Sequence, residues 1–174
     1  MTRGRTQAHR ATLVVALGLA LTACSPQTDP VATPTPTGFT SEEEAFAAAE
    51  ATYRAYIDAL NEARRGATDV APESYLIGQA LADSDQASRL LLDRGWRIEG
   101  PSRMTKAALS WWDESGVTVA VCLDSGSTRV IDEAGADVTP DDRAVLIALE
   151  VRMIWSPSHP LITTSEVSES GCSS

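Results

Sequence analysis

The sequence has 174 residues, and its 24 Asp and Glu against 14 Lys and Arg give a formal net charge of −10 at pH 7. A balance this acidic disfavours nucleic acids and anionic lipid headgroups as partners, because both require a positive patch on the protein. It is compatible with a cationic ligand, a metal ion or a basic partner, and charge that serves solubility alone explains it most simply.

The N-terminal residues have the parts of a secretory signal. Three arginines precede an apolar run over residues 11–21, and small residues stand directly before Cys24. The run is shorter than the ~20 residues that a membrane-spanning helix requires, which favours a cleaved signal peptide over residues 1–23. The sequence Leu-Thr-Ala-Cys at residues 21–24 resembles the lipobox of bacterial lipoproteins, and this resemblance implies cleavage before Cys24 and acylation of its sulfur.

The lipobox resemblance predicts a location and a tether. We expect the acylated Cys24 to hold the protein in the lipid bilayer, on the outer face of the cytoplasmic membrane. Residues 25–38 are rich in proline and threonine and lack apolar periodicity, a composition that favours extended, polyproline-like chain. We therefore predict a lipidated cysteine and tether over residues 24–40 and one folded domain over residues 41–174.

The first predicted element of the domain is a long helix. Ser41 is the expected N-cap, Glu44 occupies the reciprocal capping-box position, and Gly66 is expected to end the helix. Apolar residues recur between these ends at intervals of three and four, which predicts one buried face: Phe46, Ala49, Tyr53, Ile57 and Leu60.

Two further helical segments are predicted before the strands. Pro72 is suited to begin a short helical turn. Another helix is predicted from about Asp83, with Gln86 at its capping-box position, to Gly95 as the residue that follows its C-terminus.

The apolar period changes from 3.6 to 2 near residue 103, which predicts strands. Residues 103–112 and 117–123 form the two strands of a hairpin joined by a turn, and residues 127–131 extend or continue the second strand. The turn at residues 132–137 then reverses the chain.

The clearest strand is predicted over residues 144–155, and a weaker edge strand over residues 161–167. In the first of these, alternate apolar residues predict one buried face: Val145, Ile147, Leu149, Val151, Met153 and Trp155. Helical segments followed by about four strands predict an α+β fold, with N-terminal helices packed on a curved antiparallel sheet.

Three segments carry a resemblance to a family. The pattern A-x-x-x-Y-R-A-Y-I-D-A-L-N at residues 49–61, the Gly95-Trp96…Gly100 hinge and V-T-V-A-V-C-L-D at residues 117–124 resemble small lipoproteins of high-G+C Gram-positive bacteria. Those proteins are similar to the nuclear-transport-factor-2-like cone fold. The resemblance implies a bent sheet around helices with a cavity at its open end, serving as a ligand pocket, an active site or an oligomer interface.

We expect four side chains to line this pocket: Tyr53, Trp112, Val145 and Trp155. Trp111 and Trp112 point to opposite faces of one strand, so one of the two can be core and the other exposed.

The cysteines other than Cys24 are Cys122 and Cys172. An even number of remaining cysteines in a protein outside the reducing cytosol predicts an intramolecular disulfide. A buried free Cys122 with an exposed Cys172, or an intermolecular bridge, are the alternatives. Zinc is not expected, because the two cysteines lack C-x-x-C spacing and one histidine follows the signal segment.

The sequence offers few catalytic groups. His159 is the imidazole base of the predicted domain, lies in a Pro-flanked turn and has no G-x-S-x-G elbow to serve, so we interpret it as a surface turn residue. An isomerase would need a carboxylate facing a tyrosine in an apolar cone; Tyr53, Tyr56 and Asp58 are candidates, although core packing and partial exposure explain them better.

The acidic loop residues do not follow the EF-hand pattern, so no metal site is predicted: Asp132, Glu133, Asp137, Asp141 and Asp142. We predict no cofactor. The leading hypothesis is a lipid-anchored domain that binds a ligand or a protein partner without catalysis, and the alternative is an enzyme of isomerase or dehydratase type that uses a carboxylate and a tyrosine in the cone.

Overall fold

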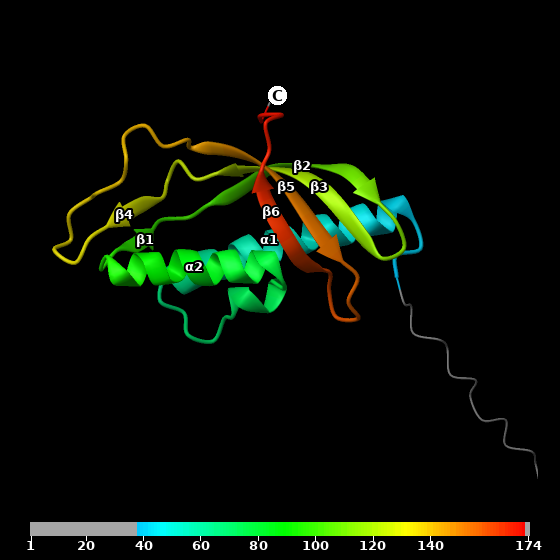
Figure 1. The fold of residues 1–174 in the computed structure, drawn as a ribbon, viewed down its shortest axis with the longest axis horizontal. Coiled ribbons are helices and arrows are strands. Elements are labelled where there is room, and N and C mark those ends of the chain that lie inside the picture. Colours follow the sequence, from blue (N-terminus) through cyan, green and yellow to red (C-terminus); the bar gives the residue numbers. More distant parts are fainter. Residues whose placement is uncertain (1–37, 173–174) are drawn as a thin grey trace, which may run out of the picture. The chain divides into compact units, whose positions relative to one another are not determined.

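The structure, a computed structural model, describes residues 38–172. The predicted signal peptide over residues 1–23, the predicted lipidation site Cys24 and the tether up to residue 37 lie outside the described residues. The domain is α+β, as predicted, and its elements follow one another along the chain (Figure 1): α1 (Glu42–Arg64), η1 (Pro72–Tyr75), α2 (Gln79–Asp93), β1 (Arg97–Glu99), β2 (Arg103–Trp112), β3 (Gly116–Asp124), β4 (Arg129–Ile131), β5 (Leu146–Ile154) and β6 (Leu161–Val167).

The main sheet is antiparallel, with the strand order β2-β3-β5-β6. The predicted hairpin is confirmed, since Leu109 of β2 lies opposite Val119 of β3. The prediction of an edge strand over residues 161–167 is also confirmed, because β6 is the last strand of the sheet. The nuclear-transport-factor-2-like cone stays a prediction.

A second, two-stranded sheet differs from expectation. β4 pairs with β1 in antiparallel register, with Ile98 opposite Val130, so residues 129–131 do not extend β3. The chain leaves β3 through a tight turn in which the Thr128 amide donates to the Ser125 carbonyl at 2.9 Å. β1 was not predicted, because three residues are too few to show alternation.

The core lies between α1 and one face of the main sheet. The valines of β3 and β5 that face α1 are fully buried, and α1 meets them with side chains of mixed size. The buried apolar set is Phe39, Ala45, Ala49, Tyr53, Ile57, Leu76, Ala80, Val117, Val119, Val121, Val151, Met153 and Ile162.

The core includes Phe39, a residue of the predicted tether. Phe39 is 2% exposed, and its ring meets Trp155 edge-on, with centroids 5.3 Å apart. The folded part of the chain therefore includes Phe39, two residues before the predicted boundary at residue 41.

The N-terminus of α1 differs from a standard capping box in one bond. Ser41 Oγ accepts from the Glu44 amide at 3.1 Å, as predicted. The Glu44 carboxylate, however, accepts from the amide of Thr40 at 2.7 Å and from the Thr40 hydroxyl. These bonds lower the pKa of Glu44. They hold Thr40, the residue before the N-cap, whereas a standard capping box holds the N-cap residue itself.

α2 begins four residues earlier than predicted. Gly78, with a φ of 62°, precedes the first helical residue Gln79, and its carbonyl accepts from the Ala82 amide at 3.1 Å. The positive φ lets the chain turn from η1 directly into the helix, so the capping signal at Asp83 is not used. The predicted end at Gly95 is confirmed: the Gly95 amide donates to Leu92 and the Trp96 amide to Leu91, the bonding pattern of a Schellman motif.

β5 is shorter than predicted, and this changes the place of Val145. Val145 precedes the strand and is 50% exposed, so the expected burial is wrong. Its carbonyl accepts from both the amide and the hydroxyl of Ser125. These bonds tie the backbone to the loop after β3 and end the alternation that would have turned Val145 inward.

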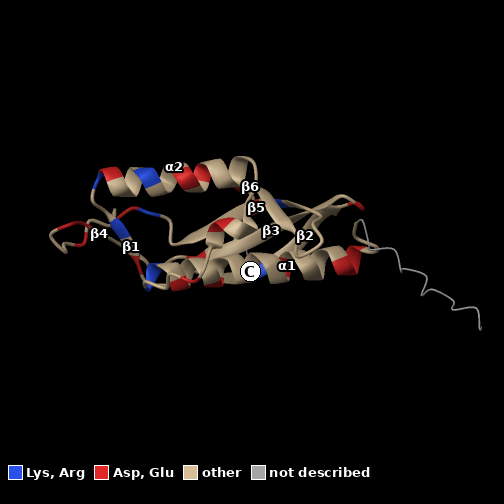
Figure 2. Ribbon diagram, turned by 90° about the horizontal axis from the view of Figure 1, so that it is seen from below, with Lys and Arg blue, Asp and Glu red and all other residues tan. Residues whose placement is uncertain are grey.

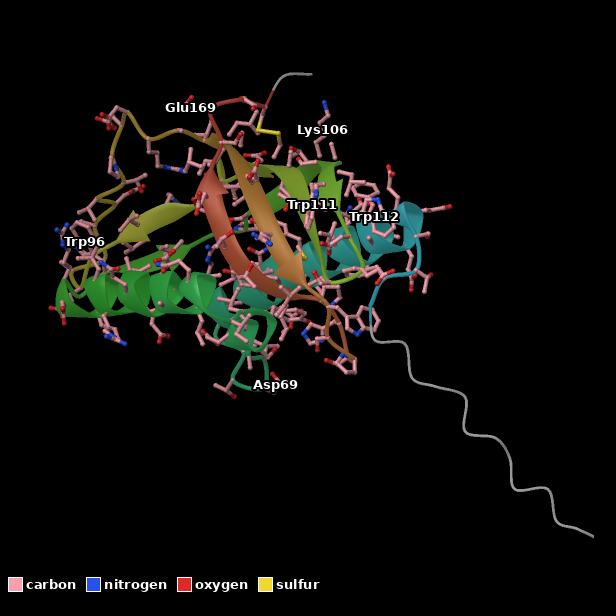
Figure 3. All side chains as sticks on the ribbon, turned by 45° about the vertical axis from the view of Figure 1, so that its right-hand side comes forward. Asp69, Trp96, Lys106, Trp111, Trp112 and Glu169 are labelled. Carbon is pink, nitrogen blue, oxygen red and sulfur yellow. A yellow bond between two sulfur atoms is a disulfide. The ribbon has the colours of Figure 1, made fainter. Side chains whose placement is uncertain are left out.

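The sulfur atoms of Cys122 and Cys172 meet at disulfide distance, with their Cα atoms 5.6 Å apart. The predicted pair joins β3 to the segment that follows β6 (yellow in Figure 3). The bridge closes a loop with a sequence separation of 50 residues.

Candidate functional site

A cavity of about 700 Å³ lies beneath α2. α2 forms one wall of the cavity. The other walls come from α1, η1, β6, β1 and Trp96, the residue before β1. Figure 1 shows α2 in front of α1, and the turned view of Figure 2 separates the two helices. The residues that line the cavity place it between α2 and the C-terminal half of α1, next to the packed core.

The side of α2 that faces the cavity carries small residues. Ala80, Ser84, Ala87 and Ser88 follow one another at helical spacing along this wall. Only Ala80 is buried in this helix, so α2 packs closely at its N-terminal end and leaves free space further along. The small side chains along this wall do not fill the gap to the next layer, and Ala87 and Ser88 remain exposed to water, so the space stays open.

The other walls are mainly apolar. Leu60 of α1, Leu76 after η1 and Ile162 of β6 form one side, and Trp96 and Ile98 form the other. Trp96 carries the guanidinium of Arg94 over its ring at 4.7 Å from the centroid. In Figure 3 Trp96 lies at the end of α2, far from Trp111 and Trp112.

Arg64 brings a positive charge into this apolar wall. It belongs to the last turn of α1, and its Nη1 donates to Ser102 Oγ at 2.9 Å. Burial lowers the pKa of the guanidinium, while the nearby Tyr56 acts in the opposite direction. Among the carboxylates of residues 38–172, none forms an ion pair with Arg64.

Tyr56 is the tyrosine of the cavity wall. Burial raises the pKa of its phenol, Arg64 lowers it and Glu73 raises it further. Its ring centroid lies 5.8 Å from that of Tyr53 and 6.4 Å from that of Tyr75. Tyr56 therefore joins the aromatic packing of the core to the cavity.

The acidic groups of the cavity lie at its rim. Glu73 and Asp83 are both exposed, and Asp83 Oδ1 accepts from Gln79 Nε2 at 2.6 Å. Throughout residues 38–172, no Asp or Glu side chain is buried. The described part of the chain thus offers no fully buried carboxylate beside a tyrosine.

The four residues predicted to line a pocket do not line this cavity. Tyr53 is 2% exposed, and burial raises the pKa of its phenol. Trp112 and Trp155 are half-buried against the core, and Val145 is half-exposed. α1 covers the predicted concave face, so Tyr53, Trp112 and Trp155 pack in or against the core, while Val145 lies outside it.

The remaining candidates lie apart from one another. Asp58 is exposed on α1. Trp111 is exposed on the outer face of the sheet, with the guanidinium of Arg152 at 5.8 Å from its ring centroid. His159 lies in the predicted turn but is half-buried, with its ring centroid 4.9 Å from that of Tyr75, so the prediction of a surface residue is only partly right.

Sequence reasoning missed Arg64 and the small-residue side of α2. Arg64 lies in the last turn of α1, where a cation is also favoured by the helix dipole, so its position alone does not mark it as a site residue. The spacing of Ala80, Ser84, Ala87 and Leu91 follows the helical period and was a usable signal. This spacing marks a face of α2 on which most side chains are too small to fill a core.

Comparisons with protein-family models, with curated proteins and with solved structures found no match to this chain. Within residues 38–172 no helix is both long and apolar enough to cross a membrane. The same residues contain no group of three or more His, Cys, Asp or Glu side chains placed to hold a metal ion.

Proposed function

We propose that the protein is a membrane-anchored, extracytoplasmic lipoprotein whose α+β domain binds an apolar small molecule, without catalysis, in the cavity beneath α2. The observation that carries the proposal is the cavity itself. Its volume of about 700 Å³ falls within the range of about 300–1,000 Å³ of small-molecule sites, which are mostly apolar with a few polar groups.

The shape of the site favours a small molecule over a protein partner. Elements from both halves of the domain surround the cavity, from α1 to β6. Leu91 and Leu92 of α2 line it, and Leu92 is 77% exposed. When a ligand covers apolar surface that was open to water, the burial favours binding by roughly 25 cal/mol per Å².

The enzyme alternative requires a buried carboxylate that faces a tyrosine. The carboxylates that line the cavity with Tyr56, Glu73 and Asp83, are exposed. An exposed carboxylate is surrounded by water and does not meet the tyrosine in the apolar setting that this chemistry uses. This arrangement supports binding over isomerase or dehydratase chemistry.

Ligand binding is tested with an uncharged solvatochromic dye, Nile red, and a variant that fills the cavity. Ala87→Trp places an indole against the cavity wall, and Ala82→Trp places the same group on an exposed position of the same helix. We expect saturable one-to-one binding in the wild type and in Ala82→Trp, and at least tenfold weaker binding in Ala87→Trp. Equal dye affinity in all three proteins, with unchanged melting temperatures, would reject the cavity as the site.

The anchor is tested separately by Cys24→Ala. We expect this variant to accumulate as unprocessed precursor or to leave the membrane fraction, because the acylated sulfur and the cleavage site are both lost. Membrane partitioning and processing identical to those of the wild type would exclude lipidation at Cys24.

A further inference from the structure

We infer that the ligand of the cavity is a single-chain amphiphile with an anionic head, a carboxylate or a phosphate, and that Arg64 binds this head while the apolar walls cover the chain. The inference rests on the proposed function and specifies the chemistry of its ligand. It is carried by the position, hydrogen bonds and surroundings of Arg64.

The Arg64 side chain has unused donors. A guanidinium has five N–H groups in a planar fork that matches carboxylate and phosphate oxygens. Within residues 38–172, Arg64 uses its side chain in one hydrogen bond, from Nη1 to Ser102 Oγ. The remaining donors are therefore available at the cavity wall.

Two other arginines show what a structural role looks like in this domain. Arg143 donates to the Ser125 carbonyl and hydroxyl and to the Thr128 carbonyl, and so closes the loop after β3. Arg97 also lines the cavity, but its Nε pairs with Glu99 at 2.9 Å and its Nη1 donates to the Asp132 carbonyl. Arg64 has neither a carboxylate partner nor a carbonyl partner of this kind in the described chain.

Asn61 holds Ser102, the hydrogen-bond partner of Arg64, in place. Asn61, one turn before Arg64, is buried and bonds the Ser102 backbone twice: its Nδ2 donates to the carbonyl at 2.8 Å, and its Oδ1 accepts from the amide at 2.9 Å. These bonds fix Ser102, and Ser102 in turn fixes one arm of the guanidinium. A preorganised cation loses little entropy when it binds an oxyanion.

Arg64 is the positive group of the inner wall, and the negative groups lie at the rim. Glu73 and Asp83 are exposed to water there, which weakens their field, although Glu73 still contributes to the raised pKa of Tyr56. Tyr56, the polar neighbour of Arg64 inside the cavity, has a raised pKa and is neutral at pH 7. Arg64 is half-buried and has no carboxylate partner among the described residues, so its charge carries part of a desolvation cost, which an anionic head bound there would offset.

The experiment compares dodecanoate, dodecyl phosphate, dodecanol and dodecylammonium, which share one chain and differ in the head. Each displaces Nile red from the purified protein below its micellar concentration. We expect the wild type to bind the better of the two oxyanions at least tenfold more tightly than dodecanol, and dodecylammonium more weakly than dodecanol, because a charge-assisted hydrogen bond is worth a factor of about ten or more. The order of dodecanoate and dodecyl phosphate identifies the head.

Two variants with the same change of charge assign this preference to a residue. Arg64→Gln is expected to reduce the preference for the oxyanion over dodecanol to less than threefold and to leave the dodecanol affinity unchanged. Arg65→Gln is the matched control, since Arg65 is the next residue, is exposed and lies outside the cavity; it should keep the preference. If Arg64→Gln melts early, Arg64→Lys, which keeps the charge, should retain a part of the preference.

The outcomes separate the inference from the proposed function. Equal binding of oxyanion and dodecanol in the wild type, or an equal loss in Arg64→Gln and Arg65→Gln, would overturn the inference and leave an apolar binding site. Preference for dodecylammonium would also overturn it, in favour of the rim carboxylates. Failure of every ligand and of the dye to bind would overturn the proposed function as well.

Discussion

α1 and α2 are both amphipathic helices that carry alanines on their inner sides, yet only α1 is packed tightly. Ala45 and Ala49 of α1 are fully buried, and Tyr53 and Ile57 fill the space beyond them. In α2 only Ala80 is buried. In this domain, alanines bring a helix close to the sheet where large neighbouring side chains complete the contact, as in α1, and leave open space where they do not, as in α2.

The largest expected effect is on the sheet side, where the pair Cys122–Cys172 constrains the chain. Cys172→Ser should lower the free energy of unfolding by about 4 kcal/mol, since the bridge closes a loop of about 50 residues. Urea unfolding measures the loss. Because neither cysteine lines the cavity, dye affinity below the melting temperature should stay constant; a large change in affinity would show that the two sides are coupled.

The next effect contrasts a filled position with an open one. Met153 of β5 is fully buried, and Met153→Ala should lower the free energy of unfolding by about 2–5 kcal/mol. Leu92 of α2 is 77% exposed, so Leu92→Ala should change the free energy of unfolding by less than about 0.5 kcal/mol. Similar losses in the two variants, measured by urea unfolding, would show that α2 is packed as tightly as β5.

A smaller effect comes from adding the same group on both helices. Ala49→Leu inserts an isobutyl group into a filled layer and should destabilise the domain by about 1–3 kcal/mol. Ala87→Leu adds it to the cavity wall, and the free energy of unfolding should change by less than about 0.5 kcal/mol. Thermal unfolding compares the pair, and a destabilisation of Ala87→Leu equal to that of Ala49→Leu would contradict the open space beneath α2.

The smallest effect is a dependence on pH, which distinguishes the two tyrosines of α1. Burial raises the pKa of Tyr53 and Tyr56 above the ordinary value of 10.0. Above pH 10 the unfolded chain loses phenol protons that the folded chain keeps, so stability is complete below pH 10 and falls as the pH rises.

Tyr53, in the filled core, should contribute more to this fall than Tyr56, at the cavity. Urea midpoints between pH 8 and pH 11 should decline less steeply in Tyr53→Phe than in Tyr56→Phe, and less steeply in both than in the wild type. An unchanged slope in Tyr53→Phe would show that its phenol ionises in the folded state as it does in water.

Periodicity predicted the parts of the fold that depend on one buried face. The predicted strands over residues 103–112 and 161–167 match β2 and β6 to the residue, because alternation records burial directly. β1 escaped prediction because three residues carry no period. The start of α2 was misplaced because a positive φ at Gly78 supplied the turn that a capping side chain usually marks.

The candidate site was less predictable than the fold. A stripe of apolar residues shows which face of an element is inward, and it does not show how far away the opposite wall stands. Tyr53 and Trp155 were rightly placed inward, and they meet packed neighbours instead of a space. Arg64 escaped notice because its position after α1's last apolar turn also fits a cation at a helix C-terminus.

Phe39 has a mechanical consequence for a chain that is pulled from its N-terminal side. Its amide donates to the Glu114 carbonyl at 3.1 Å, and its ring is wedged against Trp155. A side chain at Gly38 would collide with that same carbonyl. Force applied before residue 38 thus reaches the β2–β3 turn and the end of β5, through the contacts of Phe39, before it reaches α1.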